Sequence, residues 1–440
     1  MNSDRTFKCC VIAILCFTLP AITQAADWPN WRGPNRDGIS TETDFDPASL
    51  GPDTKPLWQA EIGIGFSSVT VSNGRAYVTG NVDRTRDVIY CFDAVSGKEL
   101  WTHSYPEPLD PKYYEGGTSA TPTVHDGKVY TISKLGKIFC LNTTTGAVIW
   151  QKAASPKPPT WGFAGSPVIQ GDLVIFNVGS AGLALNKNDG SIVWESGNGL
   201  SGYASAVPFV RDGRNCIALF GEKHLFGLET ATGKELWRAE WETLHAVNAA
   251  DPIIFGDYVF ITSGYNRGCA LLKLEAGNPV KVYENKKMRS QLSGPVLIDG
   301  YLYGIDENQL VCMDLMTGEP NWTERAIGKG SLMAAGKTLI VLSQNGMLYF
   351  AQASPVGFTP ISSAQVVKGK CWAMPIMADG RVYIRTAQGT LVCIDVRKKG
   401  MASLPTSSPA ETSGPQLAAV CTCTAVIPAM NSVSDSKDNG

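Results

Sequence analysis

The 440-residue sequence is poor in charge and in histidine. Charged residues make up 18% of the chain, the formal net charge is −2, and there are four histidines. A surface that binds nucleic acid, or attaches to a membrane through charge, depends on a local excess of Lys and Arg. The balanced composition favours neither, and we expect no nucleic-acid partner.

Long apolar runs are also scarce. The run CCVIAILCFTLPAI at residues 9–22 has 14 residues, too few for a stable bilayer-spanning helix, and no later segment is apolar and long enough. Arg5 and Lys8 precede this run, and Thr23-Gln24-Ala25 follows it with small residues, as in a secretory signal. We predict a signal peptide at residues 1–25, cleaved rather than kept as an anchor. The mature protein is then periplasmic or secreted and does not span the membrane.

The sequence lacks the common motifs of catalysis and metal binding. There is no Ser-His-Asp arrangement, no phosphate-binding loop and no set of ligands with zinc spacing. Three of the twelve cysteines lie in the predicted signal peptide, which leaves an odd number. We expect the four that share one repeat position to be buried thiols rather than a disulfide framework, because cysteine packs as a small apolar residue. These four are Cys91, Cys140, Cys312 and Cys393.

Glycine and proline, in contrast, are abundant, with 45 and 26 residues. Many turns favour an all-β chain. One turn recurs as a phrase: LNTTTGAVIW (141–150), LNKNDGSIVW (185–194), LETATGKELW (228–237) and MDLMTGEPNW (313–322), with a looser copy, FDAVSGKELW, at 92–101. In each copy the tryptophan follows the glycine by four residues.

A second marker sets the period of the repeat. Eight apolar alternating runs each begin five residues before a turn, as in PTVHDGKVYTI (122–132). Six of them begin with Pro, and Val69 and Ser331 take its place in the other two. Their starts are 36 to 53 residues apart. A period in the low forties with several short strands is typical of propeller blades. We predict an all-β, eight-bladed propeller of four-stranded antiparallel blades over residues 56–397. Seven blades is the alternative if the 36-residue copy is not a full blade.

The eighth copy stops at LVCIDV (391–396) without a fourth strand, whereas PLWQAEIG (56–63) is an unmatched strand before the first copy. We therefore expect an N-terminal strand to close the last blade and remove its exposed edges. The tryptophans of the repeat are predicted to pack between blades, because an open four-stranded sheet cannot bury both of its faces alone. They are Trp58, Trp101, Trp150, Trp194, Trp237 and Trp322.

Two segments lie outside the predicted ring. Residues 26–55, which include DWPNWRGPNRDG, are rich in Pro, Gly and Asn, and we interpret them as a capping segment in which Trp28, Trp31 and Arg32 pack against one propeller face. Residues 398–440 have no periodicity and are rich in Ser, Thr and Pro, so we predict a disordered tail. The role of Cys421 and Cys423 in that tail stays undecided.

The repeated phrase resembles the tryptophan-docking motif of PQQ-like repeat propellers, which belong to the quinoprotein alcohol dehydrogenase-like superfamily. Its best copies are Cys140/Asn142/Gly146/Trp150, Ala184/Asn186/Gly190/Trp194 and Cys312/Asp314/Gly318/Trp322, and the resemblance covers residues 56–396. It implies one of two kinds of protein. Quinoprotein dehydrogenases hold PQQ and Ca²⁺ in the central funnel, whereas BamB-like outer-membrane assembly factors bind protein partners without catalysis.

The funnel residues are expected in the segments that precede each first strand. They are Glu115, Trp161, Tyr203, His245, Asn248, Asp251, Arg289, Gln291, Lys329 and Trp372. Asp251 stands where other copies carry a small or hydroxyl residue, and Arg289 is a candidate to neutralise it. Glu115 and Asp251 are candidate cation ligands, and Trp161 and Trp372 are candidates to stack on a planar ligand.

This set falls short of the quinoprotein pattern, which the resemblance describes as a carboxylate base, Ca²⁺ ligands, a ring above the quinone and often a disulfide between adjacent cysteines. The only adjacent pair, Cys9-Cys10, lies in the predicted signal peptide. We therefore predict a monomeric, non-catalytic binding or scaffold protein of the cell envelope, with protein partners and no cofactor or metal. The alternatives are a PQQ- and Ca²⁺-dependent alcohol or sugar dehydrogenase, a polysaccharide-binding propeller, and binding of another small molecule.

Overall fold

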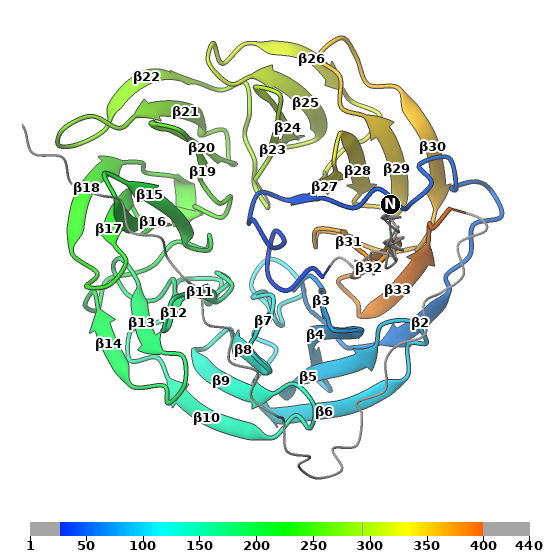
Figure 1. Ribbon diagram of the computed structural model, residues 1–440, viewed down its shortest axis with the longest axis horizontal. Helices are drawn as coiled ribbons and strands as arrows, with labels where there is room; N and C mark the ends of the chain where they lie inside the picture. The colour runs from blue at the N-terminus through cyan, green and yellow to red at the C-terminus, as the bar shows by residue number, and fades with distance from the viewer. Residues whose placement is uncertain (1–26, 293, 399–440) are drawn as a thin grey trace, which may run out of the picture. The chain divides into compact units, whose positions relative to one another are not determined.

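A computed structural model describes residues 27–292 and 294–398. Its strands form eight antiparallel sheets that follow one another around a central axis (Figure 1). The predicted eight-bladed propeller is confirmed, and the seven-bladed alternative is wrong. The predicted signal peptide (1–25) and all but the first residue of the predicted tail (398–440) lie outside the described residues, and the predicted domain boundaries stay predictions.

The first four blades are each built from four consecutive strands, which run from the axis outward. Their strands are β3 (Thr70–Ser72), β4 (Arg75–Val82), β5 (Arg86–Asp93) and β6 (Glu99–Pro106) in blade 1; β7 (Thr123–His125), β8 (Lys128–Ile132), β9 (Lys137–Asn142) and β10 (Val148–Ala153) in blade 2; β11 (Val168–Gln170), β12 (Leu173–Phe176), β13 (Leu183–Asn186) and β14 (Ile192–Glu195) in blade 3; and β15 (Val207–Arg211), β16 (Arg214–Phe220), β17 (His224–Glu229) and β18 (Glu235–Glu240) in blade 4.

Blades 5 to 7 repeat this order, and a 3-10 turn, η1 (Leu244–Ala246), precedes blade 5. Their strands are β19 (Ile253–Phe255), β20 (Tyr258–Ser263), β21 (Gly268–Lys273) and β22 (Val280–Asn285) in blade 5; β23 (Val296–Ile298), β24 (Tyr301–Asp306), β25 (Gln309–Asp314) and β26 (Pro320–Glu324) in blade 6; and β27 (Gly330–Ala335), β28 (Thr338–Ser343), β29 (Met347–Gln352) and β30 (Pro360–Gln365) in blade 7. The short copy is therefore a full blade.

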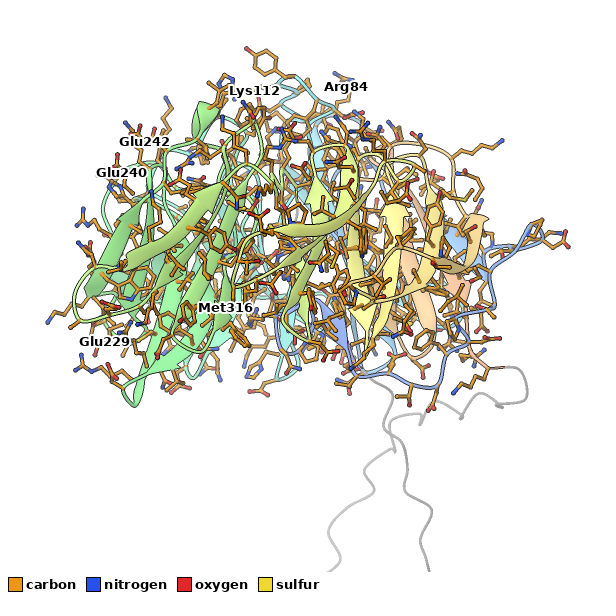
Figure 2. All side chains as sticks on the ribbon, turned by 90° about the horizontal axis from the view of Figure 1, so that it is seen from above. Arg84, Lys112, Glu229, Glu240, Glu242 and Met316 are labelled. Atoms are coloured by element: carbon orange, nitrogen blue, oxygen red, sulfur yellow. The ribbon has the colours of Figure 1, made fainter. Side chains whose placement is uncertain are left out.

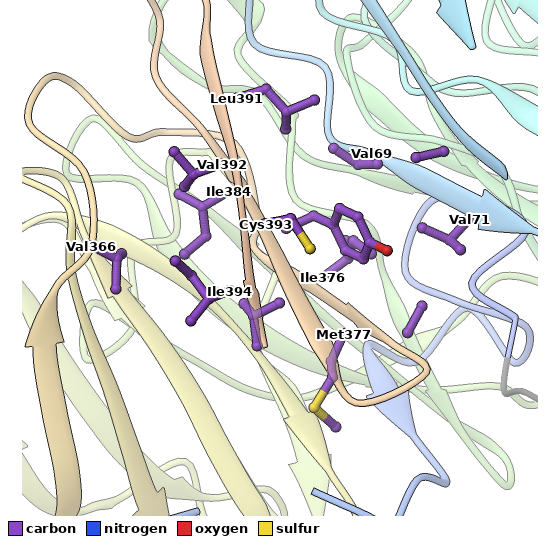
Figure 3. Packing of buried hydrophobic residues seen from close by; sticks show 14 of the residues in the cluster. Val69, Val71, Val366, Ile376, Met377, Ile384, Leu391, Val392, Cys393 and Ile394 are labelled. Carbon is purple, nitrogen blue, oxygen red and sulfur yellow. The ribbon is translucent and has the colours of Figure 1, made fainter. Parts of the chain in front are cut away.

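Blade 8 joins the two ends of the ring. Its inner strands are β31 (Ile376–Ala378), β32 (Arg381–Arg385) and β33 (Thr390–Asp395), and its outer strand is β2 (Trp58–Glu61), which pairs antiparallel with β33. The predicted closure by an N-terminal strand is confirmed. The buried side chains around this blade form one cluster with those of blades 1 and 7, in which Val71, Ile376 and Val366 come from three different blades (Figure 3). Closure thus packs blade 8 between blades 7 and 1.

The turns between strands follow the expected chemistry. Asp126 and Gly127 both have positive φ, 47° and 71°, at the two-residue hairpin between β7 and β8. This backbone suits the right-handed twist of the paired strands, and Gly adopts it without steric cost. In the third turn the side-chain oxygen of Asn142 accepts hydrogen bonds from the backbone N–H groups of Thr144 and Thr145, at 2.9 and 3.0 Å. The Asn therefore shapes the turn from which the outer strand begins.

The repeated indoles lie between blades. The Nε1–H group of Trp101 in blade 1 donates to the backbone oxygen of Thr143 in blade 2, at 2.8 Å. A β-carbon placed on Gly146 of that same turn would lie 2.6 Å from the Trp101 ring, so any larger residue would collide with it. The glycine of one blade is thus the surface on which the tryptophan of the preceding blade packs. The corresponding bonds are Trp58 to Ala94 (3.1 Å), Trp150 to Lys187 (3.1 Å), Trp194 to Thr230 (2.9 Å) and Trp322 to Ser354 (2.8 Å).

The junction between blades 4 and 5 departs from this pattern. Trp237 is buried, but its Nε1–H group has no hydrogen-bond partner among the described residues. Its ring lies against Gly227 of its own blade, and the turn of blade 5, LEAGN, is a different sequence. At the next junction Tyr283 replaces the indole, and its hydroxyl donates to the backbone oxygen of Leu315 at 2.8 Å. Both changed junctions border blade 5, whose copy of the phrase is altered.

The cysteines of the described residues are all unpaired and buried. This confirms the prediction for Cys91, Cys140, Cys312 and Cys393, which lie in the third strand of their blades. Burial raises the pKa of the Cys91 thiol to about 11, so the reactive thiolate is disfavoured. Cys421 and Cys423 lie outside the described residues.

The segment before the ring crosses the central axis (Figure 1). Trp28 exchanges two backbone hydrogen bonds with Val71 of blade 1. The buried guanidinium group of Arg32 donates to the backbone oxygens of Gly294 and Pro295 at the start of blade 6, at 3.0 and 2.7 Å. β1 (Ile39–Ser40) then runs parallel to β27 in blade 7. This segment therefore ties together blades that lie apart on the ring. Among the described residues, no helix has the length and apolarity that a membrane crossing requires.

We expect Trp150→Ala to lower the free energy of unfolding by about 3–5 kcal/mol, because it removes a large ring buried between blades 2 and 3. Chemical denaturation followed by circular dichroism measures this. A loss below about 1 kcal/mol would mean that the ring contributes little to the junction.

Candidate functional site

An open cavity on the axis of the ring has a volume of about 250 Å³. Its walls come from the segments that lead into the first strands of seven blades, which is why the cavity is central. One residue of its wall, Lys112, lies at the top of the ring in Figure 2, and Glu229 and Met316 lie in the lower half. The cavity therefore belongs to the face that carries Lys112, which we call the entry face.

A belt of hydrogen bonds holds the inner segments around the axis. The backbone N–H of Ser68 donates to the hydroxyl of Thr121, whose own N–H donates to Ser166, and the N–H of Ser166 donates to Ser205, at 2.9 to 3.0 Å. The N–H of Ser205 then donates to Oδ1 of Asp251 at 2.8 Å. Each residue occupies the same place in successive blades. The first three acceptors of this belt are hydroxyl groups, and the carboxylate of Asp251 is the last acceptor.

The second oxygen of Asp251 joins this belt to the crossing segment. Its Oδ2 accepts a hydrogen bond from the indole Nε1–H of Trp31 at 2.7 Å. Burial raises the pKa of Asp251, and the nearby positive charges of Arg32 and Arg36 oppose that shift. The expectation that Arg289 neutralises Asp251 is wrong, because Arg289 forms a bidentate ion pair with Asp306, at 2.6 and 2.8 Å.

Aromatic side chains form one wall of the cavity. The ring of Trp161 lies 5.9 Å from that of Tyr203, and its indole Nε1–H donates to the backbone oxygen of Lys112. His245 presents its ring edge-on to both Trp161 and Tyr265, each at 5.9 Å. Burial raises the pKa of Tyr203 to about 12, so its hydroxyl stays protonated. This wall is apolar with a few fixed polar atoms, as in many binding pockets.

The opposite wall centres on Trp372. Its ring lies 5.6 Å from Phe66, and the ammonium groups of Lys329 and Lys370 lie over it, 5.1 and 4.5 Å from its centre. Lys370 also pairs with the carboxylate of Glu115 at 2.7 Å. The indole is therefore held by cation–π contacts on a loop surface, where each such contact contributes about 0.5–1 kcal/mol or more.

The loop that carries Lys112 and Glu115 is anchored at its start. The buried carboxylate of Glu107 accepts hydrogen bonds from the hydroxyl of Ser133 and the N–H of Leu135, at 2.8 and 3.1 Å. Further along, the ammonium of Lys134 donates to the backbone oxygen of Asp110 at 2.6 Å. These contacts hold the first part of the loop against blade 2. Lys112 and Glu115, which follow in the same loop, therefore extend from an anchored backbone.

The structure brings together only part of the predicted site. Five of the ten predicted residues line the cavity: Trp161, Tyr203, Asp251, Gln291 and Trp372. Lys329 donates to the lining residue Gln291, Glu115 pairs with Lys370, and the exposed His245 contacts Trp161 at the rim of the cavity. Asn248 is buried and bonds to backbone oxygens of the preceding blade, and Arg289 lies in its own ion pair.

Several lining residues were missed as site residues by the sequence prediction. Trp31 was assigned to the capping segment, and Phe66, Lys112 and Tyr265 were not singled out. Phe66 follows the closing strand β2 and leads into β3, so the rule that located the other funnel segments could have found it. Tyr265 lies in a loop inside blade 5, where no rule of the repeat points to the axis.

The residues present do not fit a calcium site. Ca²⁺ takes about six to eight oxygen ligands, usually with several carboxylates. The cavity wall has one carboxylate, Asp251, and both of its oxygens accept hydrogen bonds from the protein. Glu115, the other predicted ligand, is paired with Lys370. Within residues 27–292 and 294–398, no three His, Cys, Asp or Glu side chains are grouped as a metal site.

A family model described as outer membrane protein assembly factor BamB matches residues 85–324, more than half of the chain. Among the relatives, the outer membrane protein assembly factor BamB of Moranella endobia is 24% identical over 303 residues, which cover 63% of this chain and 72% of that protein. The quinoprotein ethanol dehydrogenase of Pseudomonas aeruginosa is 27% identical over 150 residues, which cover 34% of this chain and 22% of that enzyme.

A solved structure with the same fold is the quinohemoprotein alcohol dehydrogenase of Comamonas testosteroni. It matches with a TM-score of 0.60 and 13% identity, over 86% of this chain and 82% of the enzyme. At this identity the likeness shows the fold alone. The resemblance to PQQ-like repeat propellers is confirmed, and the BamB branch is the closer one, because the match covers most of BamB and about a fifth of the ethanol dehydrogenase.

We expect Asp251→Ala to lower the free energy of unfolding by about 2–5 kcal/mol, because it leaves the buried donors of Trp31 and Ser205 without an acceptor, at roughly 1–3 kcal/mol each. Asp172→Ala, at an exposed turn, is the matched control and should change it by less than about 0.5 kcal/mol. Equal effects of the two variants in urea denaturation would contradict the assigned role of Asp251.

Proposed function

Because the chain belongs to the outer membrane protein assembly factor BamB family, we propose that it is a non-catalytic binding scaffold of the cell envelope. In this proposal it holds protein partners on the entry face. The relative from Moranella endobia is by name an assembly factor, which works on other proteins. The signal-peptide pattern at residues 1–25 supports an envelope location.

The observation that carries the proposal is an exposed apolar group at the mouth of the cavity. The side chain of Tyr113 is 99% exposed, that of Leu244 is 61% exposed, and Tyr265 is 37% exposed. Tyr113 and Tyr265 both line the cavity with Trp161, and Leu244 precedes the rim residue His245 in η1. Soluble proteins seldom expose grouped large apolar side chains without a use, and aromatic residues are enriched in the centres of protein interfaces.

The dehydrogenase alternative has less support. PQQ chemistry in the resembling enzymes uses a carboxylate base beside Ca²⁺, and here Asp251 serves as the acceptor for the belt and for Trp31. A carboxylate with both oxygens occupied is poorly placed to accept a proton from a substrate. The residues of this cavity are therefore better suited to holding a segment of protein than to oxidising an alcohol.

The glycan alternative also has less support. It required the rings of Trp161 and Trp372 to stack on sugars. The ammonium groups of Lys329 and Lys370 lie over the Trp372 ring, and Phe66 packs beside it. Trp161 is engaged edge-on by His245. Little ring surface is left for a flat sugar face on the Trp372 side.

We expect a photo-crosslinking amino acid at position 113 to capture a protein partner in living cells. Position 356 is the control, because Val356 is 91% exposed but lies in the turn between β29 and β30, the same turn of the blade that carries Met316 on the opposite face (Figure 2). Immunoblotting detects the adduct, and mass spectrometry identifies the partner.

Capture at both positions alike, or at neither, would contradict a protein-binding entry face. A second measurement addresses the enzyme alternative. Purified protein incubated with PQQ and Ca²⁺ should show no dye-linked oxidation of alcohols or sugars, and turnover there would overturn the non-catalytic assignment.

A further inference from the structure

The cavity has the size and the walls for one large side chain. Its volume is about 250 Å³, which is below the roughly 300–1,000 Å³ of pockets for drug-sized ligands. Aromatic rings from separate segments surround it, among them Phe66, Trp161, Tyr203 and Trp372. Such a pocket accommodates an aromatic anchor of the kind that dominates the energetics of many interfaces.

A positive charge beside the cavity, the ammonium group of Lys329, has no carboxylate as ion-pair partner among the described residues. Lys329 is half-buried, and within the described residues no carboxylate lies within 4.0 Å of its ammonium group. Its side-chain hydrogen bond there is to Oε1 of Gln291, at 2.6 Å. Burial lowers the pKa of Lys329, and the negative charge of Glu307, which forms no ion pair with it, opposes that shift.

The carboxylates near Lys329 are shared with other cations. Glu115 is already paired with Lys370, and Asp110 is shared between Lys112 and Lys134, at 3.1 and 3.7 Å. The ammonium groups of four lysines thus face three carboxylates, those of Asp110, Glu115 and Glu307, and Glu307 also lies 3.7 Å from the guanidinium group of Arg289. Asp251, at the cavity floor, lies with Arg32 and Arg36. The rim of the cavity is therefore positive, and a partner that places a carboxylate there is electrostatically favoured.

We propose, on the basis of the proposed function, that the cavity binds one aromatic side chain of a partner protein and that Lys329 pairs with an acidic residue adjacent to it in the partner's sequence. The occupant is a short peptide segment with an aromatic residue next to Asp or Glu. The amide of Gln291 lines the cavity, and its oxygen is held by Lys329. Its N–H₂ group is thereby directed to serve as a donor to the backbone of such a segment.

The experiment uses the full-length mature chain and a set of fluorescein-labelled hexapeptides. Each peptide has one Phe flanked by Gly and Ser, with Asp before or after it, and matched peptides carry Ala in place of Phe or Asn in place of Asp. Fluorescence polarisation measures the affinities. At least one Phe/Asp peptide should bind, with its affinity about tenfold higher than that of the Ala peptide and about threefold to fivefold higher than that of the Asn peptide.

The variants separate the two contacts. Lys329→Gln should abolish the preference for Asp over Asn while keeping the preference for Phe. Lys337→Gln, an exposed lysine in the same blade, is the matched control and should keep both preferences. Ala249→Trp fills the cavity wall and should abolish the preference for Phe. Circular dichroism spectra and melting temperatures equal to those of the parent chain show that each variant is folded.

Three results would overturn the inference: no peptide binds, Phe and Ala peptides bind alike, or Lys329→Gln keeps the preference for Asp. Binding of chitotriose that Ala249→Trp abolishes, without binding of any peptide, would assign the cavity to a glycan instead. These results test the peptide inference alone, whereas crosslinking at position 113 tests the proposed function. Capture of a partner at position 113 with no peptide binding would leave the scaffold assignment standing and remove only the peptide inference.

Discussion

The ring depends on one contact between neighbouring blades: an indole that packs on a glycine and donates its N–H to a backbone oxygen of the same turn. In the pair Trp101 and Gly146, the close approach leaves no room for a β-carbon. The glycine therefore serves the turn of its own blade and the packing of the blade before it. Four junctions use an indole in this way, those of Trp58, Trp101, Trp150 and Trp194. Tyr283 packs on Gly318 at a fifth junction, and Trp322 makes the hydrogen bond without a glycine at a sixth.

A second set of contacts organises the axis. The belt of hydroxyl groups links the inner segments of successive blades, and Asp251 connects the belt to Trp31 of the crossing segment. This arrangement uses the one carboxylate of the cavity wall for structure. The side chains left for recognition are the aromatic rings and the lysines of the entry face, which stand on loops that a closed ring holds in place.

Much of the fold could be predicted because most blades repeat the same turn and tryptophan positions in the sequence. The spacing of the turns, the position of Trp150 and the unmatched strand at Trp58 are enough for eight blades and their closure. The partner of each indole could not be predicted, since the period does not say that the ring of one blade meets the glycine of the next. The loop inside blade 5 that carries Tyr265 has no counterpart in the period either.

The site was only partly predictable for a related reason. The segments before each first strand were correctly expected at the axis, and five of the ten residues named from them line the cavity. The pairing of charges depends on which segments meet across the ring, which the sequence does not encode locally. Arg289 lies beside Asp306 of its own blade, whereas Asp251 meets the crossing segment, more than two hundred residues away in the chain.

Hydrogen exchange of the indole N–H groups, observed by NMR of the ¹⁵N-labelled protein, tests the junctions most directly. We expect slow exchange, comparable to that of the inner-strand amides, for the five indoles that donate across a junction. Exchange of these five within seconds would show that they open to water independently of the ring, and would contradict the central role assigned to them.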